Sequence, residues 1–182
     1  MSDFRKCLDE ESIDFMKEQK MFFVSTAPKS GKINLSPKGF DSLKIIDNNT
    51  IIWLNHFGSG NETAAHLIED DRITLMFCAF EGKALILRIY AHAKVLHERD
   101  EDYSKYIKEF SYNNAARQIF VLDIDCINLS CGMGVPLYDY KEQRKELKKF
   151  YDSRTKEEHR AYMKKNNVLS FDKKETNLFK EV

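Results

Sequence analysis

A turn between an apolar run and an amphipathic segment is the first place where the sequence suggests chemistry. Residues 53–67 read WLNHFGSGNETAAHL, and the turn holds Gly58 and Gly60, two of only seven glycines in the 182-residue chain. A tight turn before a helix leaves backbone N–H groups free at the helix start, and such groups bind anions. Three further residues of the turn carry side chains that donate hydrogen bonds: Ser59, Asn61 and Thr63. The turn therefore suggests an anion site.

The same turn also has an interpretation without a ligand. Ser59 and Glu62 have the S-x-x-E spacing of a capping box, in which two side chains satisfy the N–H groups of a helix start. Glu62, in the first helical turn, would also repel a phosphate. The sequence of the turn alone leaves both interpretations open.

Two neighbouring segments supply residues that suit a phosphorylated, ring-containing ligand. Ser36 and Lys38 share one strand face by parity and offer a hydroxyl and a cation. Trp53 and Asn55 also share a face, along which a ring edge could lie. Each of these residues has an ordinary role as well, since lysines are mostly solvated and tryptophans mostly belong to the core.

Arg88 places a charge in the apolar strand sequence LILRIYA. A charge inside a central strand costs free energy unless it is paired, so we expect either a ligand phosphate or an acidic partner beside it. Asp123 and Asp125 of a later strand are the alternative partners.

Other kinds of site find little support. His92 and His97 are five residues apart and face opposite sides of one strand, so they cannot hold one metal ion, and we expect no metal site. The sequence has no GxSxG motif. The four cysteines lack metal-knuckle spacing, and we expect reduced thiols: Cys7, Cys78, Cys126 and Cys131.

Composition narrows the class of protein. Lys+Arg and Asp+Glu both number 29, so the formal net charge is zero and nothing favours nucleic acid or a membrane surface as partner. The hydrophobic fraction of 42% is typical of a folded globule. The N-terminal residues lack the apolar region of a secretion signal, and no apolar run reaches the roughly 20 residues of a membrane span. We expect a cytoplasmic protein.

The apolar pattern predicts a β-rich middle between helical ends. Strands are expected at residues 21–27, 33–39, 42–47, 50–57, 72–80, 84–96 and 117–130. Helices are expected at residues 4–20, 62–71, 100–110 and 140–167. With hairpin connections and one helix inserted midway, these strands predict an antiparallel barrel or sandwich. We expect one domain over 1–182, with a barrel at about 21–140 and a helical extension at about 141–182.

Four motifs in order carry a resemblance to a known family. INLSPKGF, IIWLNHFGSGNETAAHL, RITLMFCAFEGKALILRIYAHAKVL and SCGMGVPLYDY resemble the pyridoxamine 5′-phosphate oxidase-like family of FMN-binding split barrels. The similarity runs from about Phe22 to Tyr140, and KKNNVLSFD resembles the tail of an uncharacterised branch. The resemblance implies a mainly β fold with α, an antiparallel split β-barrel with peripheral helices. It also implies FMN as cofactor, a small-molecule substrate, and a homodimer with the flavin site at the interface.

Mapped onto this chain, the resemblance gives a set of cofactor-binding residues and leaves the catalytic residues unassigned. The set is Ser36, Lys38, Trp53, Asn55, Ser59, Gly60, Asn61, Thr63 and Arg88. The loop from Cys131 to Tyr138 is expected to line the ligand cleft. No general acid or base is expected, because the flavin itself accepts the hydride.

Two residue patterns depart from the family: the first bears on how tightly FMN binds, and the second argues against the vitamin B6 reaction. Gly60 and Asn61 stand where pyridoxamine phosphate oxidases carry a basic pair, and KETNLFKEV lacks their C-terminal arginine and histidine. The expectation is an FMN-dependent oxidoreductase that transfers a hydride between flavin and an unidentified small molecule. The alternative is a non-catalytic flavin or haem binder that acts as a carrier or sensor, and a deazaflavin also stays open as the ligand.

Overall fold

One antiparallel sheet makes up most of the molecule. The computed structural model describes residues 2–180. Its strands are β1 (Ser2–Arg5), β2 (Phe22–Thr26), β3 (Asn34–Lys38), β4 (Leu43–Ile45), β5 (Thr50–His56), β6 (Arg72–Cys78), β7 (Leu85–Leu96) and β8 (Ala116–Cys131). They are ordered β3-β2-β6-β7-β8-β5-β4, and β1 pairs with the end of β8. Every pairing is antiparallel, as the hairpin spacing predicts.

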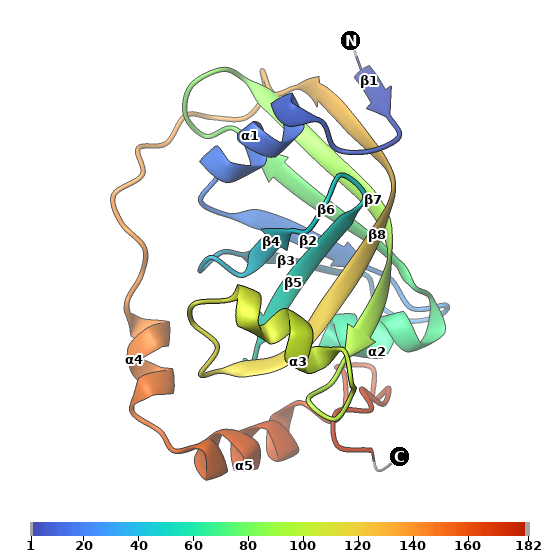
Figure 1. Cartoon of the computed structure of the whole chain (residues 1–182), viewed down its shortest axis with the longest axis vertical. Coiled ribbons are helices and arrows are strands. Elements are labelled where there is room, and N and C mark those ends of the chain that lie inside the picture. Colours follow the sequence, from blue (N-terminus) through green and yellow to red (C-terminus); the bar gives the residue numbers. More distant parts are fainter. Residues whose placement is uncertain (1, 181–182) are drawn as a thin grey trace.

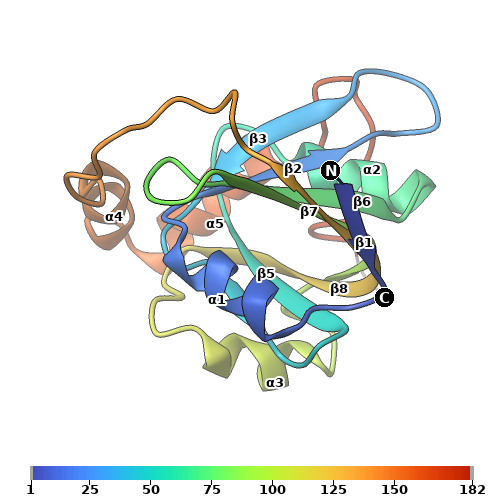
Figure 2. The same cartoon turned by 90° about the horizontal axis from the view of Figure 1, so that it is seen from above.

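The sheet curls around its own core (Figure 1). Seen from above in Figure 2, β3, β2, β6 and β7 form one side of the curl and β5 with part of β8 forms the other. Alternate residues of the central strand, such as Leu87 and Ile89, are buried inside, as period-two alternation requires. The fold is a split antiparallel β-barrel, mainly β with α, which confirms the predicted fold class.

The helices lie around the sheet rather than within it. They are α1 (Glu10–Glu18), α2 (Glu62–Glu69), α3 (Tyr103–Tyr106), α4 (Glu146–Asp152) and α5 (Lys156–Asn166), with a 3₁₀ turn at Ile107–Glu109. Phe15 and Met16 of α1 bury against the core inside the curl, and so do Ala64 and Leu67 of α2. None of these helices is long and apolar enough to cross a bilayer.

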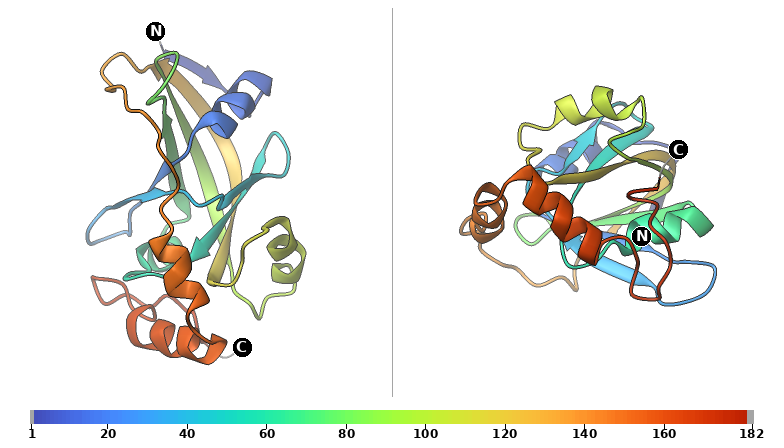
Figure 3. Two further views of the ribbon diagram at one scale, coloured as in Figure 1. Left: turned by 90° about the vertical axis from the view of Figure 1, so that its left-hand side faces the viewer. Right: turned by 90° about the horizontal axis from the view of Figure 1, so that it is seen from below.

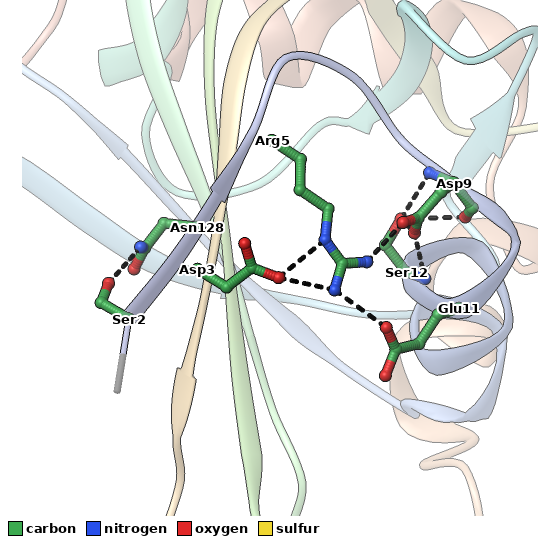
Figure 4. Close-up of polar contacts among 7 residues, drawn as sticks. All are labelled: Ser2, Asp3, Arg5, Asp9, Glu11, Ser12 and Asn128. Atoms are coloured by element: carbon green, nitrogen blue, oxygen red, sulfur yellow. Dashed lines mark hydrogen bonds and ion pairs between the residues drawn. The ribbon is translucent and has the colours of Figure 1, made fainter.

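The predicted helix at 4–20 is wrong in its first part. Residues 2–5 form β1, and the helix starts only after Asp9, whose side chain and that of Ser12 form a capping box. Arg5 contacts the carboxylates of Asp3, Asp9 and Glu11 (Figure 4). These contacts join β1 to the start of α1. Local capping and strand pairing therefore override the weak helical period of these residues.

The predicted helix at 140–167 is also wrong as a single element. Residues 136–145 form an exposed connection, and two short helices follow it. Thr155 and Glu158 form a second capping box, which starts α5 and separates it from α4. Figure 3 shows this extension running along the barrel from one end to the other, where α5 and the last residues lie near α2.

Candidate functional site

Most of the predicted cofactor-binding residues gather on the inner side of β3, on β5 and at the start of α2. Ser36 and Lys38 lie opposite the core residues Val24 and Phe22 in the β2–β3 register, which places both on the inner face. The ammonium of Lys38 lies 5.3 Å from the centre of the Trp53 ring. Ser36 and Lys38 therefore share one face of β3, as parity predicts, and Lys38 on this face lies close to Trp53 of β5.

Trp53 belongs to the core. Its side chain is 1% exposed, and its ring stacks on Phe120 at a centroid distance of 4.7 Å. Its contact with the candidate site is the ammonium of Lys38, which lies over the indole ring. Its place among the cofactor-binding residues stays a prediction.

A second pair of predicted residues forms a buried polar group with a residue that the sequence analysis does not include. The Nδ2 of Asn55 lies 3.5 Å from Oδ1 of Asn61 and 3.4 Å from Oε1 of Gln118. Thr63 lies beside this group, and its hydroxyl is 3.5 Å from Nδ2 of Asn34. The buried amides thus link β5, β8 and the first residues of α2.

Arg117 enters the site because of a bulge. In the β5–β8 ladder Asn55 pairs with Gln118 and His56 pairs with Ala116, so Arg117 is the extra residue without a partner. Bulges re-aim side chains in this way. Its Nη1 donates to the carbonyl oxygen of Gly60 at 2.8 Å, and the residue is 6% exposed. A guanidinium from β8 therefore lies against the glycine turn.

The site holds more buried positive charge than negative. Burial, with a smaller contribution from the charge of Arg117, lowers the pKa of Lys38 to about 8. Burial also lowers the pKa of Arg117, though the group stays protonated at neutral pH. Burial lowers the pKa of His56 to about 4, which keeps that imidazole neutral. Among residues 2–180, neither Lys38 nor Arg117 forms an ion pair with a carboxylate.

Several buried polar atoms of this region have no partner within the described chain. They are Oγ of Ser36, Nε of Arg117, Nε2 of Gln118, Nε2 of His56 and Oδ1 of Asn167. Buried polar groups are normally hydrogen-bonded, and an unpaired one costs about 1–3 kcal/mol. Two unpaired cations and these orphan atoms, beside a helix start, fit an anion with several oxygen acceptors.

The glycine turn is not closed by a capping box. Helix α2 begins at Glu62, its N-cap is Asn61, and Asn61 makes no side-chain cap hydrogen bond. Ser59 is exposed on the turn, two residues before the N-cap position of this helix. The capping-box interpretation of Ser59 and Glu62 is therefore wrong. The helix starts later than the S-x-x-E pattern indicates.

Arg88 lies apart from the other predicted residues. On β7 its neighbours Leu87 and Ile89 point into the core, so Arg88 points to the opposite face of the sheet. Its Nη1 donates to Oγ of Ser130 at 3.1 Å, and no contact joins it to Asp123 or Asp125 within residues 2–180. Within one chain it does not meet Lys38 and Arg117.

The loop from Cys131 to Tyr138 is largely exposed, and its first glycine has a packing role. A Cβ at Gly132 would lie 2.7 Å from the backbone nitrogen of Leu85, so close strand contact requires a glycine there. Met133 is 84% exposed. Whether this loop lines a ligand cleft stays a prediction.

Metal and thiol chemistry gain no support from the structure. Residues 2–180 contain no cluster of three or more histidine, cysteine or acidic side chains that could hold a metal ion. All four cysteines are free. His92 of β7 contacts Asp71 at 2.8 Å, and His97 is buried just after the end of that strand, so strand parity does not apply to it.

Comparison with known proteins agrees with the curled sheet and the order of the motifs. The family model described as pyridoxamine 5′-phosphate oxidase matches residues 8–131. The chain belongs to the pyridoxamine 5′-phosphate oxidase family.

Several known proteins are similar to parts of this chain. A "Pyridoxamine 5′-phosphate oxidase family protein ustO" of Aspergillus flavus is 37% identical over 144 residues, which are 76% of this chain and 58% of that protein. The chain thus spans little more than half of that relative's length. HupZ of Group A Streptococcus has the same fold, with a TM-score of 0.53 and 18% identity over 66% of this chain and 91% of that one. A Lactobacillus delbrueckii protein assigned provisionally to pyridoxamine 5′-phosphate oxidase gives 0.53 and 19%, over 68% and 94%.

Two surface cavities of this chain lie away from Lys38 and Arg117. One of about 400 Å³ lies between α2, β7 and the C-terminal residues, and its lining includes His97 and Arg99. The other, of about 350 Å³, lies between α1 and β4 beside Phe22. Neither is lined by Lys38 or Arg117. We place the candidate site at the unpaired charges, because the cavity linings lack that concentration of orphan donors.

Proposed function

We propose that this chain binds FMN and acts as a flavin-dependent oxidoreductase on a small molecule. The observation that carries the proposal is a pair of cations without a carboxylate partner among residues 2–180: the buried Arg117 at the turn before α2, and the half-buried Lys38 on the inner face of β3. A phosphate dianion would neutralise both charges. The orphan hydroxyl of Ser36 and the N–H groups at the start of α2 would donate to its remaining oxygens.

Arg117 also accounts for a departure of the sequence from the family pattern. Gly60 and Asn61 replace the basic pair that the resemblance implies at the first turn of α2. The guanidinium of Arg117 lies on the Gly60 carbonyl instead. We infer that β8 supplies the positive charge at this turn in place of the missing residues.

The proposal includes a homodimer with the flavin site at its interface. Several large apolar side chains are 64–84% exposed: Phe4, Ile33, Leu35, Met133, Leu137 and Phe171. Exposed apolar groups in this number favour a protein partner, and a second copy would also enclose the ring of a cofactor. Light scattering at micromolar concentration should give twice the chain mass of 21.4 kDa. A mass of one chain would contradict the dimer.

The protein's part in the reaction is binding and orientation. When bound, a flavin supplies an acceptor for a hydride. Lys38 and Arg117 would hold the phosphate and so fix the position of the ring, which is the contribution of this chain to orientation. His56 stays neutral at physiological pH and is therefore no general acid of the imidazolium type. A cytoplasmic location belongs to the same proposal.

The absorption spectrum of freshly purified protein tests the proposal. A two-banded yellow flavin spectrum is expected, and bleaching of that spectrum by NAD(P)H without oxygen would distinguish an oxidoreductase from a carrier. A sharp Soret band would favour haem. Protein that is colourless and takes up no added FMN would refute flavin binding.

A further inference from the structure

The residues after α5 return to the glycine turn of the candidate site. We call residues 167–180 the C-terminal tail. Asn167 is fully buried, and its Nδ2 donates to the carbonyl oxygen of Gly58 at 2.8 Å. Its own carbonyl oxygen accepts from Nδ2 of Asn61 at 3.1 Å and from Oγ1 of Thr176 at 2.8 Å. One tail residue thus holds both ends of the Gly58–Asn61 turn.

The tail also binds the acidic residue at the start of α2. Both carboxylate oxygens of Glu62 accept from the backbone N–H of Phe171, at 3.1 and 2.9 Å. The side chain passes close to the turn, since a Cβ added at Gly60 would lie 3.2 Å from its Oε1. Its charge is near enough to Arg117 to raise the pKa of that guanidinium, against the larger lowering by burial. A neutral backbone donor therefore holds an anion beside an unpaired cation.

Two ion pairs fix the tail to both elements that carry the site. Lys174 contacts Glu69 of α2 at 2.5 Å. Asp172 contacts Lys32 of the β2–β3 hairpin at 2.8 Å and also accepts from its backbone N–H at 2.7 Å. Figure 3 shows the tail beside α2. The tail is thus joined to α2 and to the hairpin that carries Ser36 and Lys38.

We propose that the C-terminal tail is a positioning element for the phosphate of the bound flavin. The Phe171 N–H keeps the Glu62 carboxylate on the tail, and Asn167 holds the turn in its anion-binding shape. Without that N–H, the carboxylate is free to move onto the Arg117 guanidinium and compete with the phosphate. This inference rests on the proposed function, because it assigns the tail a role toward the ligand proposed there.

Proline at position 171 removes the decisive donor. Phe171→Pro deletes the N–H, whereas Phe171→Ala keeps it and loses a side chain that is 71% exposed and whose ring centre lies 4.9 Å from the Lys32 ammonium. FMN and riboflavin are titrated into the full-length parent and each variant in buffer without phosphate. We expect Phe171→Pro to weaken FMN about tenfold and riboflavin less than twofold, with Phe171→Ala like the parent. Adding Glu62→Gln to Phe171→Pro should restore FMN binding, because the competing charge is gone.

Asn167→Ala is a second variant that does not depend on tolerance of a proline. It should weaken FMN about fivefold and riboflavin less than twofold, because it removes the bond to Gly58. Equal weakening of both flavins in Phe171→Pro, or no rescue by Glu62→Gln, would show a purely structural tail. An unfolded Phe171→Pro together with an unchanged FMN-to-riboflavin ratio in Asn167→Ala would also overturn the inference. A parent that binds neither flavin would refute the proposed function, and the inference with it.

Discussion

Replacement of Arg117 by methionine should stabilise the flavin-free protein and weaken its binding of FMN. The guanidinium is 6% exposed, and within the described chain it has one hydrogen bond, to Gly60, and an unpaired Nε. Burial of an ion costs several kcal/mol, and one charged hydrogen bond returns about 1.5–3 kcal/mol. Methionine fills similar volume without the charge. We therefore expect a gain of about 1 kcal/mol, or about 2–4 °C in Tm for a chain of this size.

Flavin affinity should change in the opposite direction. Loss of one charge-assisted contact costs about 1.5–3 kcal/mol, so FMN should bind roughly ten- to a hundredfold more weakly to Arg117→Met. Riboflavin has no phosphate, and its affinity should change less than twofold. Arg117→Lys keeps the charge without the planar fork and should fall between parent and Arg117→Met. Thermal melts and titrations in one phosphate-free buffer measure both effects.

The reasoning fails if Arg117→Met destabilises the protein and leaves the preference for FMN over riboflavin unchanged. A lower Tm in Arg117→Met with an unchanged ratio of FMN to riboflavin affinity would make Arg117 a structural residue. In that case its hydrogen bond to Gly60 would stabilise the turn by more than burial of the charge costs. The orphan atoms around it would then need another explanation.

Three further predictions concern the pH dependence, the turn and the extension. Burial lowers the pKa of Lys38 to about 8 in the flavin-free protein, and a bound phosphate would raise it. FMN affinity should therefore be greatest between about pH 7 and 8, where the phosphate is a dianion, and fall as the pH rises from about 8 to 9.5, whereas Lys38→Met should bind more weakly and lose this slope. Ser59→Ala should leave the free energy of unfolding within about 0.5 kcal/mol of the parent, since Ser59 caps no helix; a loss of about 1 kcal/mol in denaturant melts would restore the capping-box interpretation. Thr155→Ala should lower the free energy of unfolding by about 1 kcal/mol, because its hydroxyl caps α5, whereas an unchanged value would favour one continuous helix across that position.

The fold follows from the sequence wherever apolar residues alternate over a whole strand. The predicted strand at 84–96 and the helix at 62–71 are confirmed within a few residues, because burial of one face dictates their period. Prediction fails where local caps decide. The T-x-x-E pattern at Thr155 marks a helix start inside a long run of charged helix formers, and it outweighs their continuous propensity.

Only part of the candidate site can be predicted from the sequence. Strand parity is enough to predict that Lys38 and Ser36 share one face of β3, but only the β2–β3 register of the structure shows that this is the inner face. Arg117 could not be found this way, because it stands at the start of an apolar run and only the bulge in the β5–β8 ladder turns it toward Gly60. Asn167 lies more than a hundred residues from Gly58 along the chain, and no local pattern indicates their contact. Burial of unpaired charge is a property of the folded chain alone.

The most direct test of the phosphate site is a pair of calorimetric titrations of the parent protein, one with FMN and one with riboflavin. The two ligands share the ring and the ribityl chain and differ in the phosphate. If Lys38 and Arg117 bind that phosphate together, FMN should bind at least a hundredfold more tightly than riboflavin, from two contacts of about 1.5–3 kcal/mol each. Equal affinity for the two ligands would contradict the site.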